Sequence, residues 1–219
     1  MLNCNSALLT IASEFVGRYS PYQSIQISPA SYYGGVYFAS TDGGKISCLA
    51  YDPSGSMDDY ITLLPNSELI KASRGVKTAS RTLSIETDSK VALVTTHRKT
   101  TSESKEIPVT YSSVEFPDLA GALQDCIKRW KVESSATAGR YDINYVQRAI
   151  KSLSSINSSV TLHSFDGGPM RIQEESGNIV ILVMPQTAEP IPPVPDWLKA
   201  YSQHKMARGF YDPSTPSVV

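Results

Sequence analysis

A strand, a capped turn and a helix follow one another in the stretch YITLLPNSELIKASRG, residues 60–75. Residues 60–63 have the apolar, β-branched character of a strand, and Asn66 stands where the N-cap of a helix belongs. Two further strands are expected at 81–86 and 91–96. The stretch therefore predicts a β-α-β-β unit, in which a helix packs on one face of an antiparallel sheet.

The same order of elements returns in the second half of the chain. A strand at 140–143 precedes a helix at 144–153, with Asn144 at the cap position and Gln147 at the spacing of a capping box. The strands that close this half are expected at 160–163, 170–173 and 179–184. Duplication of a β-α-β-β unit explains the repeat, and two unrelated α+β segments are the alternative.

The remaining patterns also indicate an α+β fold. A short amphipathic helix is expected at 5–17, with Asn5 or Ser6 as its cap and Gly17 at its end. Gly-rich turns separate the strands that follow it. These strands are expected at 25–27, 36–39 and 45–50, with another at 107–111 and a helix at 119–131.

Composition describes a globular protein without a strong overall charge. The 219 residues include 41% hydrophobic residues and have a formal net charge of −1, so a DNA-facing surface would need local clusters of Lys and Arg. Cys4, Cys48 and Cys126 show no metal or redox spacing, which favours reduced thiols. We find neither a signal-peptide pattern nor an apolar run long enough to cross a bilayer, and we expect a soluble cytoplasmic protein.

Positive charge gathers on the polar sides of three expected helices. Lys71 and Arg74 lie three residues apart on one helix, and Arg148 and Lys151 have the same spacing on another. Such helices can contact DNA phosphates without reading bases, although ordinary solvated helices carry similar residues. The candidate DNA-binding residues are Lys71, Arg74, Lys77, Lys128, Arg129, Lys131, Arg148 and Lys151.

Four short motifs resemble, in order, segments of the bacterial β sliding clamp family, the β subunit of DNA polymerase III. ASTDGGKISC at 39–48 is similar to a strand-turn-strand segment of the family's middle domain, and FPD at 116–118 to the end of that domain. YDINYVQRAI at 141–150 and ILVMP at 181–185 are similar to segments of the last domain. Their joint order is more specific than any one motif.

The resemblance implies a non-enzymatic processivity factor of DNA replication that uses no cofactor. Clamps of this family are closed rings whose helices surround DNA and whose clefts bind short peptides of polymerases and repair proteins. The implied partners are double-stranded DNA of any sequence, a DNA polymerase or other clamp-binding proteins, and further copies of the chain, without a membrane. The matching cleft positions are Thr41, Gly43, Gly44, Lys45, Ile46, Pro117, Val183, Met184 and Pro185.

The chain departs from the family pattern in its cleft and in its length. Gly44, Lys45 and Ile46 replace a His-Arg-Leu sequence, and no counterpart of the family's first domain is found. We therefore expect two clamp-like domains, the second of them abbreviated, and a Pro-rich tail. Their expected bounds are 1–118, 119–186 and 187–219. A shortened phage clamp that acts in the host cytoplasm fits this length.

Residues capable of catalysis or metal binding form no recognisable pattern. The histidines, at positions 97, 163 and 204, are scattered, and Asp58 with Asp59 is a surface pair of a common kind. The segments 42–44 and 166–168 are expected to be hairpin turns rather than phosphate-binding loops, because neither lies between a strand and a helix and neither is followed by a Lys-Ser or Lys-Thr pair. We expect no catalytic residue, metal or cofactor. A clamp-like scaffold or decoy that does not encircle DNA, and an unrelated α+β protein, remain alternatives.

Overall fold

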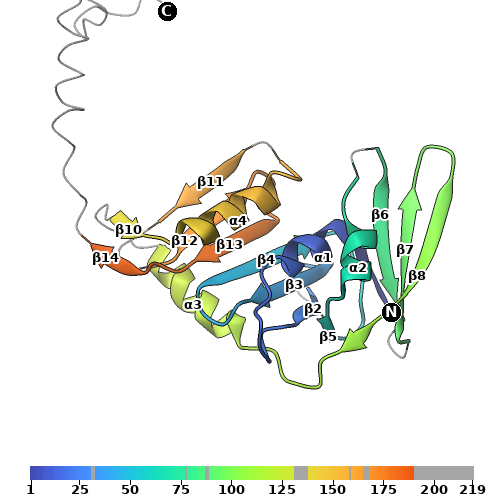
Figure 1. Ribbon diagram of the computed structural model, residues 1–219, viewed down its shortest axis with the longest axis horizontal. Coiled ribbons are helices and arrows are strands. Elements are labelled where there is room, and N and C mark those ends of the chain that lie inside the picture. Colours follow the sequence, from blue (N-terminus) through green and yellow to red (C-terminus); the bar gives the residue numbers. More distant parts are fainter. Residues whose placement is uncertain are drawn as a thin grey trace, which may run out of the picture.

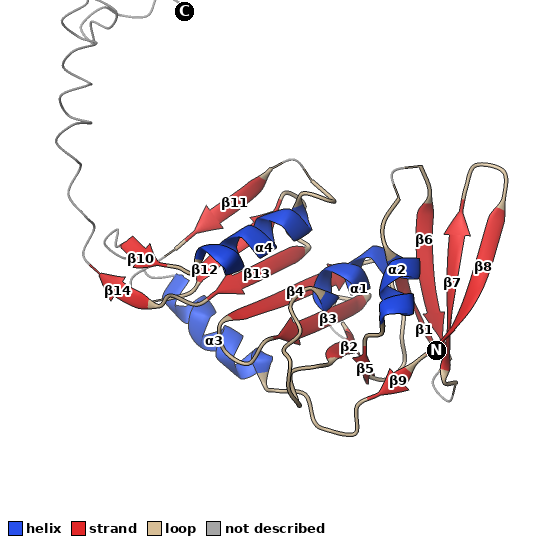
Figure 2. Ribbon diagram, in the orientation of Figure 1, coloured by secondary structure: helices blue, strands red, loops and turns tan. Residues whose placement is uncertain are grey.

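Three successive units with the same order of elements make up the fold (Figure 1). The computed structural model describes residues 1–30, 33–76, 78–86, 89–130, 138–157, 159–164 and 168–189. Each unit contains a strand, a helix and three more strands, to which units 2 and 3 each add a short last strand, so the sequence pattern found twice is present three times. The expected α+β fold is confirmed, since all the strand pairs within these residues are antiparallel and helices cover a sheet face (Figure 2).

Unit 1 begins with a strand that the sequence patterns do not predict. The unit consists of β1 (Leu2–Asn5), α1 (Ser6–Ser13), β2 (Ile25–Pro29), β3 (Val36–Thr41) and β4 (Ile46–Asp52). The Asn5 side chain accepts a hydrogen bond from the Ala7 backbone N–H (3.0 Å) and caps α1 as expected. The helix ends at Ser13 and not at Gly17, whose N–H donates to the Tyr22 carbonyl in the following loop.

Unit 2 contains the stretch that suggested the fold. It consists of β5 (Ile61–Leu64), α2 (Ser67–Ser73), β6 (Ser80–Ile85), β7 (Val91–His97), β8 (Ser102–Pro108) and β9 (Thr110–Tyr111). The Asn66 side chain accepts a hydrogen bond from the Leu69 N–H (2.8 Å), which confirms the predicted cap. The expected strand at 107–111 is divided between β8 and β9, because the two segments belong to different sheets: β8 pairs with β7, and β9 pairs with β5.

Unit 3 follows α3 (Leu119–Trp130), which connects it to unit 2. It consists of β10 (Ala138–Arg140), α4 (Ile143–Leu153), β11 (Val160–His163), β12 (Met170–Glu174), β13 (Ile179–Val183) and β14 (Thr187–Glu189). The prediction that Asn144 caps α4 is wrong. The cap is Asp142, whose carboxylate accepts a hydrogen bond from the Asn144 N–H (2.8 Å). Strand β14 occupies the first residues of the expected tail, and residues 190–219 lie outside the described part of the chain.

Units 1 and 2 exchange their first strands. Strand β1 of unit 1 pairs with β6 of unit 2, in a sheet of order β1-β6-β7-β8. Strand β5 of unit 2 in turn pairs with β2 of unit 1. Helices α1 and α2 pack together beside these sheets, and the Ser6 hydroxyl donates to the Ser73 carbonyl (3.0 Å). The two units thus form one structural body around a shared apolar core.

A different contact joins unit 3 to unit 1. Strands β13 and β4, each the fourth strand of its unit, pair antiparallel with Val183 opposite Ile46. This pairing produces an eight-stranded sheet of order β11-β12-β13-β4-β3-β2-β5-β9. Figure 1 shows α1, α2 and α4 on one side of the molecule, so the helices of all three units form a single layer.

Candidate nucleic-acid interface

The helix layer contains a groove between α1 of unit 1 and α4 of unit 3. Its volume is about 680 Å³, and we call it the helix-face groove. Three of the predicted DNA-binding residues, Arg74, Arg148 and Lys151, line it together. They come from different units, and the β4–β13 pairing brings them to the same groove. The other lining residues are Ala7, Thr10, Ile11, Glu14, Gly75, Asn144, Gln147, Ser152, Ser155 and Ile156.

The cations of this face are not neutralised by carboxylates. Within the described residues, neither the three groove cations nor Lys71, on the exposed side of α2, belongs to an ion pair. Glu68, which lies near Lys71 in sequence, instead forms an ion pair with Lys105 of β8 (2.8 Å). Glu14 is the acidic residue that lines the groove. The face therefore has an excess of positive charge available to an anionic ligand.

Arg148 is held in place by its own helix. Its guanidinium carbon lies 5.5 Å from the centre of the Tyr145 ring, one turn earlier on α4. A cation over the face of an aromatic ring is attracted by the ring's quadrupole, and the guanidinium edge stays available for hydrogen bonds. The side chain is therefore partly ordered before any ligand binds.

A second groove of about 780 Å³ continues the first along the helix layer, and the two share Ala7, Gly75, Ser155 and Ile156. Arg81, which the sequence patterns did not single out, lines the second groove. Its Nη1 donates to the carbonyls of Ala72 (2.8 Å) and Arg74 (2.7 Å) at the end of α2. No helical spacing marks this residue, because it lies on a strand.

The other predicted cations lie elsewhere or outside the described residues. Lys77 and Lys131 are not described, and for Lys128 and Arg129 the structure describes the backbone of α3 but not the side chains. The basic residues of α3 predict that this helix faces DNA together with α2 and α4. Its first turns instead line a groove on the opposite face of the long sheet. The layer's third helix is α1, which carries no basic residue.

The structure brings together the two distant segments of the predicted peptide cleft. The Met184 N–H donates to the Lys45 carbonyl (2.8 Å), directly beyond the pair Ile46–Val183. Ile46 and Val183, expected to line the cleft, have their side chains buried in the core, and Thr41 is buried as well. The exposed part of the cleft consists of Gly43, Gly44, Lys45 and Met184, with Pro185 half-buried.

The turn in this cleft is rigid. The Asp42 carboxylate accepts hydrogen bonds from the backbone N–H groups of Lys45 (2.9 Å) and Ile46 (3.0 Å). Gly43 and Gly44 have φ angles of 99° and 144°, which L side chains rarely adopt. The turn thus presents a fixed backbone to a ligand.

A larger groove, of about 930 Å³, lies on the face of the long sheet opposite the helix layer, and we call it the outer-face groove. Its walls are residues 115–120 and Leu123 on one side and outward side chains of the sheet on the other. Pro117 is the member of the predicted cleft that lines it. The apolar or aromatic lining residues include Tyr37, Leu49, Tyr51, Phe116, Leu119 and Val180.

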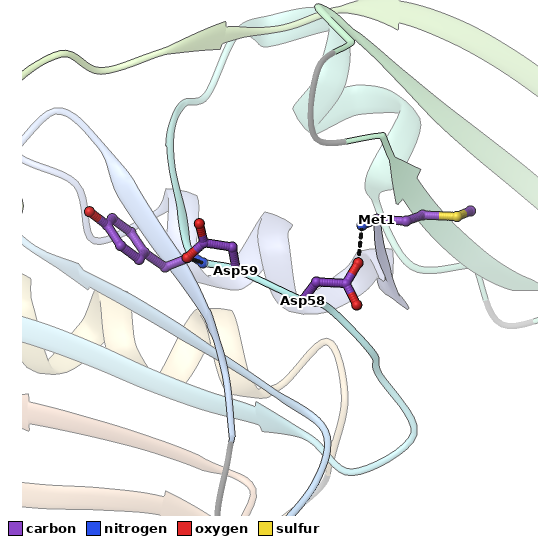
Figure 3. Close-up of polar contacts among 4 residues, drawn as sticks. Met1, Asp58 and Asp59 are labelled. Carbon is purple, nitrogen blue, oxygen red and sulfur yellow. Dashed lines mark hydrogen bonds and ion pairs between the residues drawn. The ribbon is translucent and has the colours of Figure 1, made fainter.

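The side chains of Asp58, Asp59 and His97 are held in structural contacts. Asp58 forms an ion pair with the Met1 ammonium (2.6 Å), and Asp59 accepts a hydrogen bond from the Tyr60 N–H (2.8 Å). The two carboxylates point apart (Figure 3). His97 lies within 3.0 Å of the Thr82 hydroxyl and 3.1 Å of that of Ser102. The described residues contain no cluster that could hold a metal ion, and none of the described helices is long and apolar enough to span a membrane.

Comparisons with known proteins identify the fold. No protein-family model and no curated protein matches the sequence. Among solved structures, proliferating cellular nuclear antigen from Entamoeba histolytica superposes with a TM-score of 0.52 and 13% identity, over 85% of this chain and 99% of that one. The β subunit of DNA polymerase III from Borrelia burgdorferi gives 0.55 and 10%, over 85% of this chain and 63% of that one. The chain therefore has the fold of a sliding clamp.

Proposed function

We propose that this protein is a sliding-clamp-like processivity factor of DNA replication. It holds duplex DNA against its helix layer and recruits a DNA polymerase or other partners through short peptides, without catalysing a reaction itself. The observation that carries this proposal is the convergence of Arg74, Arg148 and Lys151 in one groove of a clamp-like fold. The expected site of action is the cytoplasm, including that of a phage-infected host.

Backbone contacts account for the kind of DNA binding that we propose. Arg and Lys side chains on exposed helices suit phosphate oxygens, which occur on every sequence. Binding should therefore be independent of sequence and sensitive to salt.

Peptide recruitment is assigned to the side of the sheet away from the helix layer and to the β4–β13 boundary. The outer-face groove offers an apolar floor, and Met184 beside the rigid turn 43–45 offers an adaptable side chain that is 44% exposed. Burial of one Leu or Phe anchor contributes roughly 1.5–3 kcal/mol before ordering costs. Micromolar affinity corresponds to about 8 kcal/mol, so several such contacts would together give an isolated peptide an affinity on the order of micromolar.

Retention on DNA would require more than one copy of the chain. Strand β8 of unit 2 corresponds to β4 of unit 1 and β13 of unit 3, which pair with each other. Among the described strands, only β7 pairs with β8, so β8 forms an edge of its sheet. Pairing between β8 and a strand of another copy would extend the helix layer around a duplex.

Binding to duplexes of unrelated sequence tests this function directly. We expect dissociation constants that agree within about threefold between sequences, and that rise steeply between about 50 mM and 200 mM salt. A strong preference for one sequence, or no binding at the lower salt concentration, would reject the DNA-holding function.

A scaffold or decoy that binds clamp-interacting peptides without encircling DNA is the second candidate. The outer-face groove favours this second candidate. It is larger than the helix-face groove and does not include the basic residues of the helix layer, so a peptide could bind there without DNA. Peptide binding without measurable DNA binding would support this candidate over the first.

A further inference from the structure

The third unit lacks the neighbour that its two counterparts have. In the body formed by units 1 and 2, the second strand of each unit is flanked by the first strand of the other, because β5 pairs with β2 and β1 pairs with β6. The corresponding strand of unit 3 is β11. Within the described residues, β11 pairs only with β12 and forms the end of the eight-stranded sheet.

The side chains of β11 show the effect of this difference. Leu162 stands opposite Ile172, which is fully buried beneath α4, so both side chains face the helix-covered side of the sheet. The inward residues of the corresponding strands are almost completely buried, with Ile25 and Ile27 in β2 and Leu83 and Ile85 in β6. Leu162, by contrast, is 55% exposed.

One flank of α4 continues this apolar surface. Ile143 and Ile150 are 77% and 42% exposed and lie seven residues apart, which places them on the same side of the helix. Ala149 and Leu153 face the core, and the residues that line the helix-face groove occupy the other flank. Helix α1 of unit 1 is covered by α2 of unit 2, whereas the main contacts of α4 are with β12 and β13 of its own unit.

The first strand of unit 3 is arranged like that of unit 2. Strand β5 lies between β9 of its own unit and β2 of unit 1. Strand β10 pairs in the same manner with β14 of its own unit, and no described strand occupies its other side. Unit 3 thus has both a strand to donate and an edge to receive one.

From these features we infer that two copies of this chain pair through unit 3. Strand β10 of each copy adds to the β11 edge of the other, as β5 adds to β2 and β1 to β6 within one chain. A two-fold axis between the copies then buries Leu162, Ile143 and Ile150 of both. Because Arg148 and Lys151 lie on the other flank of α4, the pairing leaves the helix-face groove open.

Self-association measured by light scattering tests this inference without DNA and without a partner peptide. We expect the wild type to form at least a dimer at micromolar concentration. Leu162→Asp and, separately, Ile150→Asp should halve the molar mass and raise the dissociation constant roughly 30-fold or more, as for a buried interface residue. Both side chains are partly exposed in the single chain, so circular dichroism should show an intact fold.

Val114→Asp is the matched control, because Val114 is an apolar residue of similar exposure, 46%, that lies outside unit 3. It should leave the mass unchanged. Hydrogen exchange adds a second measure: in the assembly, the amides of β11 that point away from β12 should exchange more slowly than in Leu162→Asp.

Three results would overturn the inference. One is a wild type that stays monomeric at high micromolar concentration. Another is an assembly whose mass neither aspartate variant changes. The third is a wild type that stays monomeric while a chain without residues 190–219 dimerises. In that case the chain's own tail, and not a second copy, would occupy the β11 edge. None of these measurements involves DNA, so they test the pairing of two copies separately from the proposed DNA-binding function.

Discussion

Replacement of the three groove cations by alanine is the sharpest test of the DNA-facing surface. Arg74, Arg148 and Lys151 line one groove and form no ion pair among the described residues, so the triple variant removes three charges without leaving a carboxylate unpaired. Each phosphate contact contributes about 0.9 to the slope of log K against log salt concentration. The triple variant should therefore lower the slope by about 2.7 and weaken binding about 500-fold at about 0.1 M salt.

Fluorescence anisotropy with a short labelled duplex, repeated across a salt series, measures both quantities. The matched control replaces Lys45, Lys90 and Lys99 by alanine, which changes the net charge by the same amount and likewise breaks no ion pair among the described residues. These residues are exposed and line neither groove of the helix layer. A general effect of net charge would appear in both variants, whereas a local phosphate contact would appear only in the first.

Equal slopes for the groove variant and its control would refute the reasoning. Such a result would mean that the converging cations are solvated and that DNA, if bound, contacts another surface. A smaller loss confined to Arg148→Ala would instead point to a single ordered contact, since Arg148 is the cation that stacks on Tyr145.

Three further predictions concern the cleft and the buried carboxylates. Met184→Asp should weaken binding of a clamp-interacting peptide at least about tenfold while leaving the DNA salt slope unchanged, because an anion replaces the exposed apolar side chain of the cleft; peptide titration measures this. Asp52→Ala should lower the free energy of unfolding in urea by about 2–3 kcal/mol, because the N–H groups of Asn5 (2.6 Å) and Ser54 (3.0 Å) lose their buried acceptor; a loss below about 0.5 kcal/mol would contradict this. Burial raises the pKa of Glu174, but hydrogen bonds from Ser176 and Asn178 outweigh burial and hold this pKa below its ordinary value. The stability that its carboxylate contributes is therefore complete above the unfolded pKa of about 4.3 and lost as the pH falls through the folded pKa, so Glu174→Gln should reduce the dependence of unfolding free energy on acid pH.

Local signals in the sequence predicted the elements of the fold well. Asn5 and Asn66 cap helices as expected, because each side chain accepts a hydrogen bond from a backbone N–H no more than three residues away in the sequence. Asn144 failed for a reason that sequence does not contain. Asp142 and Asn144 are both good caps, and the choice between them depends on where α4 starts, which Ala149 and Leu153 determine by docking into the core.

The sites depend on contacts between distant parts of the chain and were harder to predict. The spacing of Arg148 and Lys151 predicted a basic helix side, but their meeting with Arg74 depends on the β4–β13 pairing. A pattern that could have indicated the outer-face groove lies in residues 46–52. Ile46, Cys48 and Ala50 alternate there with Leu49 and Tyr51, so both faces of β4 carry apolar side chains and both require covering.

The two kinds of contact between units also limit how copies of the chain can assemble. Units 1 and 2 meet by strand exchange, in which the first strand of each unit pairs with the second strand of the other. Units 1 and 3 meet edge to edge through their corresponding fourth strands, and the strands are antiparallel in both kinds of contact. Unit 2 presents the sheet edge β8 for an edge contact, and unit 3 presents the sheet edge β11 for an exchange contact. If each contact forms with its counterpart in another copy, it relates the two copies by a two-fold axis. A closed assembly that uses both contacts must alternate between them, and it therefore contains an even number of chains.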